Sequence, residues 1–315
     1  MMTRLYTVIQ IGLLISFPIL GTQAKAQQVI ASDKDPADLI LGVLEDVPGN
    51  SVGESDFRAV RAIFKKSGSE WKPFPTRCKS YTDLKLVARA YPKDVEWTVA
   101  FNGHSLGSVT ARTPPEFRFY SLIGIENITS RGPVPTVGEK SPIYSGFLAT
   151  PVYRPLVAVS QRNFTDPDQW KRSRLPEERV AVARRQFRAK FPKVVNCKNP
   201  DENIPRPWMY HDEDIKAGKT YTSNKDWSLV ELSLTGWACD GRQENGSAFT
   251  GQWYAVKPSG TLEFLGTDMW LVDAGDYDND GESEVLFSIN GYNKGGYRLF
   301  YEDFSKSVEF IFTYH

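Results

Sequence analysis

The chain has 315 residues, and 38 lysines and arginines balance 38 aspartates and glutamates, so the formal net charge is zero. A chain of this length can form one large domain or two smaller ones. The balanced charge excludes the basic excess that is typical of a nucleic-acid-binding surface, and we expect no nucleic-acid partner.

Residues 1–26 have the pattern of a secretory signal peptide. Arg4 provides a positive charge, residues 5–20 are mainly apolar, and Ala24-Lys25-Ala26 is a small-residue cleavage motif. No later segment of the sequence is long and apolar enough to be a membrane-spanning helix. We therefore expect an extracytoplasmic protein, periplasmic or secreted, whose mature chain starts at Gln27 and has no membrane span.

Residues 27–195 are predicted to form a β-rich part that ends in a helix. Asn102-Gly103 separates two apolar runs, and Asn-Gly in that position is the strongest short signal for a β-hairpin. The helix is expected at 176–190, because apolar residues recur there at helical spacing and Pro192 ends the run. The strands expected before the helix are 39–47, 57–65, 71–74, 97–101 and 106–111.

Residues 196–222 are rich in proline and charged residues, and we predict that they form a loop-rich connection to 223–315. In this C-terminal part short apolar runs again alternate with turns. The strands expected there are 227–234, 253–256, 261–265, 269–272, 284–289, 297–301 and 308–313. The predicted fold is all-β, a β-propeller-like array of antiparallel hairpins with one inserted helix. Paired β-sandwich domains are the alternative.

The stretch 276–284 has the pattern of a calcium-binding loop. Three aspartates occur at alternate positions, so their short carboxylates can converge as the chain curls, and Gly281 permits a sharp turn. An EF-hand would need a glutamate at position twelve, where this chain has Phe287 in a predicted strand. The alternative is a solvated acidic turn between two strands. The expected ligands are the carboxylates of Asp276, Asp278, Asp280 and Glu284 and the main-chain carbonyl of Glu282.

This loop resembles the FG-GAP/VCBS-type repeats, the calcium-bearing blade motif of integrin-α-like β-propellers. Residues 275–287, Gly-Asp-Tyr-Asp-Asn-Asp-Gly-Glu-Ser-Glu-Val-Leu-Phe, carry the resemblance in one clear copy near the C-terminus. The resemblance implies a propeller-type fold with Ca²⁺ as the cofactor, bound by the five residues named above. We expect the ion to stabilise the turn and to take no part in catalysis.

The sequence contains the three cysteines Cys78, Cys197 and Cys239. In an oxidising compartment two of them are expected to form a disulfide, although the sequence leaves the pairing open. We favour Cys197 with Cys239, because both lie in polar, loop-like sequence that flanks one segment. Cys78 would then be buried.

Aromatic residues in loops are the candidates for ligand contact. Trp208, Tyr210 and His211 lie next to an acidic run and offer flat faces to a sugar, and Tyr292 lies among glycines. The sequence has three histidines, no Gly-x-Ser-x-Gly motif and no glycine-rich phosphate loop, which disfavours several enzyme classes. We expect a calcium-stabilised binding or structural module with a protein or glycan ligand. The alternative is a glycan-acting hydrolase or lyase that uses carboxylates.

Overall fold

Every sheet in the described part of the chain is antiparallel, which confirms the predicted all-β, antiparallel class. No helix in that part is both long and apolar enough to cross a membrane. The predicted signal peptide at 1–26, Cys197 and Tyr292 lie outside the described residues. The computed structural model describes residues 39–47, 57–138, 153–196, 206–234, 238–239, 251–291 and 293–314.

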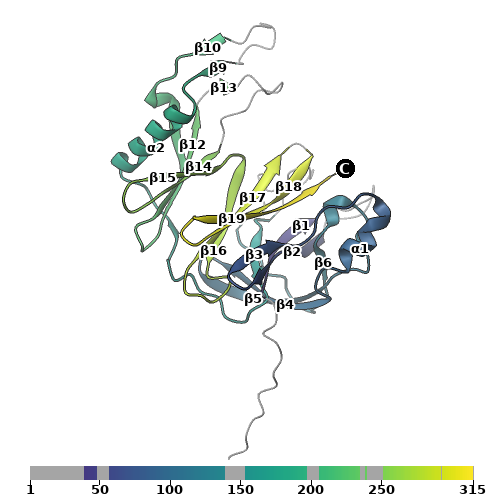
Figure 1. Ribbon diagram of the computed structural model, residues 1–315. Helices are drawn as coiled ribbons and strands as arrows, with labels where there is room; N and C mark the ends of the chain where they lie inside the picture. Colours follow the sequence, from purple (N-terminus) through teal and green to yellow (C-terminus); the bar gives the residue numbers. More distant parts are fainter. Residues whose placement is uncertain are drawn as a thin grey trace, which may run out of the picture. The chain divides into compact units, whose positions relative to one another are not determined.

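Six of the N-terminal strands close into a barrel (purple to teal in Figure 1). They pair in the order β1-β7-β4-β5-β6-β2, and β2 also pairs with β1, so the barrel has no open strand edge. These strands are β1 (Ile40–Val47), β2 (Phe57–Ser67), β4 (Asp94–Phe101), β5 (His104–Arg112), β6 (Ile125–Ile128) and β7 (Leu156–Val159). The remaining elements of this part are β3 (Glu70–Pro73), which pairs with β2, and the short helices η1 (Tyr81–Asp83), α1 (Leu84–Ala88) and η2 (Tyr120–Leu122).

The hairpin predicted at Asn102-Gly103 is confirmed. It joins β4 to β5, and the two turn residues have φ angles of 51° and 77°. Both angles lie in the left-handed region, which asparagine and glycine adopt more readily than other residues. The local sequence therefore determines this turn.

The barrel interior is filled by Trp97 of β4. Its ring lies 3.0 Å from the position that a Cβ atom would take at Gly42, on a strand that is not adjacent to β4. Its indole Nε1 donates a hydrogen bond to Glu126 Oε2 at 2.9 Å, and Thr113 Oγ1 donates to Glu126 Oε1 at 3.3 Å. Glu126 is fully buried, and this burial raises its pKa to about 8. The core of the barrel therefore holds a protonated carboxyl group at neutral pH.

A second sheet of five strands carries helix α2 (Glu177–Lys190) on one face (green in Figure 1). Val180, Ala183 and Phe187 of the helix are buried together with Val230 and Tyr254 of the sheet. The three helix residues have the helical spacing expected from the sequence, so the predicted helix is confirmed. The sheet has the order β15-β14-β12-β11-β8 and comprises β8 (Lys171–Arg172), β11 (Ile215–Thr222), β12 (Ser228–Leu234), β14 (Gln252–Val256) and β15 (Leu262–Gly266).

The stretch 196–222, predicted to be a loop-rich connection, contains part of this second sheet. β11 pairs with both β12 and β8, and Ile215 at its start is fully buried. Charged residues and Gly218 interrupt the apolar alternation that would have indicated a strand. Helix α2, predicted to end the N-terminal part, packs on the strands that follow it. A small sheet adjoins this region and comprises β10 (Arg206–Trp208), β9 (Val194–Asn196) and β13 (Ala238–Cys239), with η4 (Asp212–Asp214) before β11.

The last four strands form a meander in sequence order (yellow in Figure 1). One face of this sheet packs on the barrel, since Phe310 lies edge-to-face with Phe64 of β2 at 6.5 Å between ring centroids. The meander therefore shares one apolar core with the barrel. Its strands are β16 (Met269–Gly275), β17 (Glu284–Gly291), β18 (Lys294–Tyr301) and β19 (Lys306–Thr313).

The described strands form a closed barrel and further antiparallel sheets, and a propeller-like ring of hairpins is not evident among them. The sequence indicates consecutive hairpins but not which distant strands meet. Closure of the barrel depends on β7, which pairs with both β1 and β4 although β1 lies far earlier in the chain. Such pairings between distant strands leave no local signal in the sequence.

Candidate metal centre

The predicted calcium loop is the turn between β16 and β17, residues 276–283, which we call the acidic loop. Its two ends meet as the pair Gly275 and Glu284 at the base of the hairpin. Asn279 and Gly281 have φ angles of 60° and 89°. The left-handed conformation at Gly281 agrees with the sharp turn expected from the sequence. A tight curl of the main chain therefore brings the acids of the loop towards one point.

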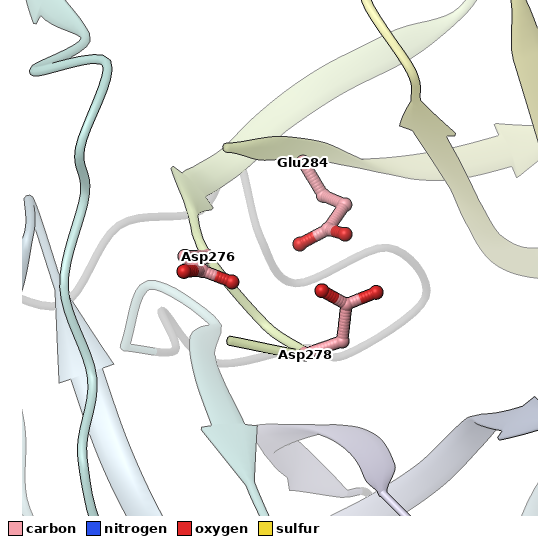
Figure 2. Close-up of side chains that lie close together, drawn as sticks. All are labelled: Asp276, Asp278 and Glu284. Carbon is pink, nitrogen blue, oxygen red and sulfur yellow. The ribbon is translucent and has the colours of Figure 1, made fainter. Parts of the chain in front are cut away.

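Three carboxylates converge inside this curl, and we call them the carboxylate cluster: Asp276, Asp278 and Glu284. Each offers an oxygen that lies within 4.8 Å of the oxygens of the other two. Figure 2 shows the three side chains pointing towards a common space from the loop and from the start of β17. Their residues are only 5%, 9% and 3% exposed, respectively. Three carboxyl groups are therefore withdrawn from water at one place.

Main-chain N–H groups of the loop hold the cluster in this shape. Asp276 accepts hydrogen bonds from the N–H of Gly281 at 3.0 Å and of Asp280 at 3.2 Å. Glu284 Oε2 accepts the N–H of Tyr277 at 2.7 Å. Hydrogen bonds from N–H donors favour the ionised form of a carboxylate, whereas burial disfavours it. The main chain of the loop thus contributes directly to the position of Asp276 and Glu284.

Two of the five predicted ligands lie outside the carboxylate cluster. Asp280 is exposed, and its Oδ1 accepts the N–H of Glu282 at 2.9 Å. The side chain of Glu282 is exposed, as suits a residue predicted to contribute only its carbonyl oxygen. The structure therefore brings together Asp276, Asp278 and Glu284, and Asp280 lies near enough for its charge to raise the pKa of Glu284.

The β2–β3 hairpin of the barrel also reaches the carboxylate cluster. The ammonium group of Lys66 forms an ion pair with Asp278 Oδ2, and the indole Nε1 of Trp71 donates to Glu284 Oε1 at 3.3 Å. Lys66 and Trp71 are direct cross-strand partners, so one hairpin presents both groups. Sequence reasoning did not identify these residues, because they are 212 and 213 positions away from their partners.

A third segment, residues 161–168 after β7, supports the acidic loop from another side. The side-chain amide of Gln161 donates to the carbonyl of Asp276 at 3.1 Å, and the N–H of Asp276 donates to the carbonyl of Thr165 at 2.9 Å. Ser283 Oγ donates to Asp166 Oδ1 at 2.6 Å. The acidic loop is therefore the point at which three distant parts of the chain meet.

The electrostatics of the cluster favour a cation. Burial raises the pKa of Glu284 well above its ordinary value, and the nearby Asp278 raises it further. Burial likewise raises the pKa of Asp276. A bound cation would reverse both effects, because it stabilises the ionised carboxylates. The donors are all hard oxygens, which fit Ca²⁺ and Mg²⁺ better than softer metals.

The other predicted site residues do not form a common site. Tyr210 is buried, its hydroxyl donates to the carbonyl of Phe191, and its ring packs edge-to-face on Phe187, so it belongs to the core under α2. Trp208 is half-buried beside it, and His211 is exposed at the start of η4. For the predicted disulfide, Cys197 lies outside the described residues and only the main chain of Cys239 is described. Cys78 is a half-buried free thiol.

Comparison with known proteins finds no relative of this chain. No protein-family model matches the chain, and neither does any curated protein or solved structure. The geometry of the site is therefore the basis for a functional conclusion.

Proposed function

We propose that this protein is an exported, calcium-stabilised β-rich module that binds a protein or glycan ligand or serves a structural role. The observation that carries the proposal is the carboxylate cluster, in which three nearly buried carboxylates approach within 4.8 Å of one another. Lys66 is the one ion-pair partner of these carboxylates among the described residues, and a divalent cation would offset the remaining cost of burying their charges. The predicted signal peptide would place the protein outside the cytoplasm, where the calcium concentration is high. Calcium is therefore the cation that we propose.

The expected role of the ion is to hold distant parts of the chain together. Asp276 and Asp278 belong to the acidic loop, Glu284 begins β17, and the β2–β3 hairpin and residues 161–168 contact the same loop. The carbonyl of Glu282 and water would complete the six to eight oxygens that Ca²⁺ requires. Its chemistry here is charge neutralisation, so loss of the ion would weaken the packing of the last sheet on the barrel.

The same proposal interprets the four-stranded meander β16–β19 as a unit of the propeller-blade type. Its strands follow one another in sequence order, and the acidic loop joins its first two strands. The meander β11-β12-β14-β15 in the second sheet has the same order of neighbours. Both observations support hairpin-built units of the kind that the FG-GAP/VCBS resemblance implies.

Removal of calcium is expected to lower the thermal stability of the protein. At free calcium of about 100 times the Kd the ion contributes about 2.7 kcal/mol, which corresponds to a Tm change of roughly 5 °C for a chain of this length. The measurement is a thermal melt in a chelator, followed by a melt in excess calcium chloride. Identical melting curves under the two conditions would refute the proposal.

Two loop variants make the test specific. In Asp278→Asn the shape of the side chain stays and one cluster charge is lost, so the calcium-dependent change in Tm should disappear. Glu282→Gln removes a charge from the same loop but alters an exposed side chain outside the cluster. The Glu282 variant should therefore retain the full calcium response. If both variants lost the calcium-dependent change in Tm equally, the response would come from the total negative charge of the loop and not from a defined binding site.

A further inference from the structure

Lys66 brings a positive charge into the proposed calcium site. Its ammonium group pairs with Asp278 Oδ2, and the side chains of the two residues are 16% and 2% exposed. In the described part of the chain it is the only lysine or arginine that forms an ion pair with the carboxylate cluster. The ammonium group also lies 5.3 Å from the ring centroid of Trp71 and 5.9 Å from that of Tyr301. Lys66 is thus enclosed between acids and aromatic rings.

The position of this ammonium group conflicts with calcium binding. Asp278 Oδ1 already accepts the N–H of Asp280 at 3.1 Å, and Lys66 occupies Oδ2. A calcium ion that binds Asp278 must therefore share or replace one of these partners. The N–H of Asp280 is fixed by the curl of the loop, whereas Lys66 has a flexible four-carbon side chain. Lys66 is the partner that can leave.

The structure provides room for the displaced side chain. A cavity of about 360 Å³ lies beside the cluster and is lined by Lys66, Gly68, Ser69, Glu302 and the acidic loop. The main chain of Lys66 is held in place, because its N–H donates to the carbonyl of Leu39 at 2.8 Å. Only the side chain has to move when a cation enters. The acid Glu302 and the ring of Tyr301 line the space into which it would turn.

We propose that Lys66 is a built-in competitor for the cation: its ammonium group takes the place of the metal in the calcium-free protein and thereby sets the calcium affinity of the site. This inference rests on the calcium site proposed above. Without calcium, Lys66 keeps the buried cluster partly neutralised and the fold intact. A calcium ion must displace the ammonium group of Lys66 in order to bind, and this competition lowers the calcium affinity of the site. The site is therefore occupied at high, extracytoplasmic calcium concentrations and not at trace concentrations.

The test compares calcium binding and stability in the wild type and in Lys66→Met, which keeps the apolar stem and removes the charge. Titration calorimetry with calcium chloride should give a Kd that is lower in the variant by roughly 5- to 150-fold, the usual range for coupling between two binding events. In chelator, the variant should melt below the wild type, because its cluster has no counter-ion. Lys66→Gln, prepared and kept in calcium, provides a second neutral variant if Lys66→Met does not fold without the ion.

A matched control is Lys72→Met in β3, an exposed lysine that neighbours Trp71 but lies on the other face of the strand. It changes the net charge equally and should leave both Kd and Tm unaltered. If the wild type binds calcium and both Lys66 variants bind it equally or more weakly, the competitor role is wrong and the calcium site stands. If no protein in the series binds calcium, the calcium site itself is wrong. Binding by the Lys66 variants alone would support the competitor role and show that Lys66 has replaced calcium in the wild type.

Discussion

Replacement of Arg61 by methionine is expected to lower the free energy of unfolding by about 3–5 kcal/mol, the usual cost of removing one partner from a buried ion pair. Arg61 lies on β2 with its side chain 3% exposed, and its guanidinium binds Glu45 Oε1 at 2.7 Å. It also donates to the carbonyls of Ser121, at 3.0 Å, and Ile123. Tyr297 of β18 donates to the other oxygen of Glu45. The variant would leave the half-buried Glu45 carboxylate without a counter-ion, with only Tyr297 as a donor, and two carbonyls without the guanidinium.

The reason for so large an effect is the position of this network between the barrel and the last sheet. The guanidinium of Arg61 lies 4.1 Å from the ring centroid of Phe312 in β19, and Tyr297 joins the network from β18. The face of the Phe312 ring stabilises the buried guanidinium charge of Arg61. The Tyr297 hydroxyl group stabilises the carboxylate of Glu45 by donating a hydrogen bond to it. Loss of Arg61 would therefore weaken the packing of two sheets as well as one ion pair.

Urea denaturation of three variants checks this prediction. Arg112→Met removes an arginine from the same barrel, but its pair with Asp94 is exposed, with both side chains at 66%. An exposed pair contributes about 0–1 kcal/mol, so this control should be nearly neutral. Addition of Glu45→Gln to Arg61→Met should recover part of the loss, because no unpaired charge then remains. A cost below about 1 kcal/mol for Arg61→Met would contradict the structural role of the network.

Glu126→Gln is expected to stabilise the protein above neutral pH and to change the pH dependence of its stability. The pKa of Glu126 is raised by burial from 4.5 to about 8, so the folded state keeps a proton that the unfolded state releases. The contribution of Glu126 to wild-type stability therefore falls as the pH rises from 4.5 to 8, by about 1.4 kcal/mol for each pH unit. Glutamine has no proton to release, and its side chain can still accept the hydrogen bond from Trp97. At pH 8 the variant should be more stable by about 3–5 kcal/mol.

The measurement is the difference in unfolding free energy between Glu126→Gln and the wild type across a pH series. Burial also raises the pKa of Asp273, to about 7, and that of Glu284. Both groups change the stability of the two proteins equally, so the difference reports Glu126 alone. Glu116→Gln, at an exposed position outside the barrel strands, should follow the wild-type curve. A difference that stays constant with pH would show that Glu126 has an ordinary pKa in the folded protein.

The local features of this fold were predictable from short stretches of sequence. The helix α2 follows from Val180, Ala183 and Phe187 at helical spacing, and the β4–β5 hairpin from Asn102-Gly103. The acidic loop follows from alternating aspartates and Gly281. Each of these signals lies within a few residues of its own structure, because hydrogen bonds in a helix or a turn join near neighbours.

The tertiary structure alone decided how these pieces combine. Barrel closure by β7, the burial of Glu126 against Trp97 and the approach of Lys66 to Asp278 all join residues that are far apart in the chain. Alternating apolar residues show that a strand has a buried face, but not which strand it will face. Short sequence patterns were enough to predict an all-β chain and an acidic loop with the composition of a calcium site. The burial of Glu284 beside Asp276 and Asp278, and the ion pair of Lys66 with Asp278, follow only from the packed structure, because burial and charge pairing depend on which distant segments meet.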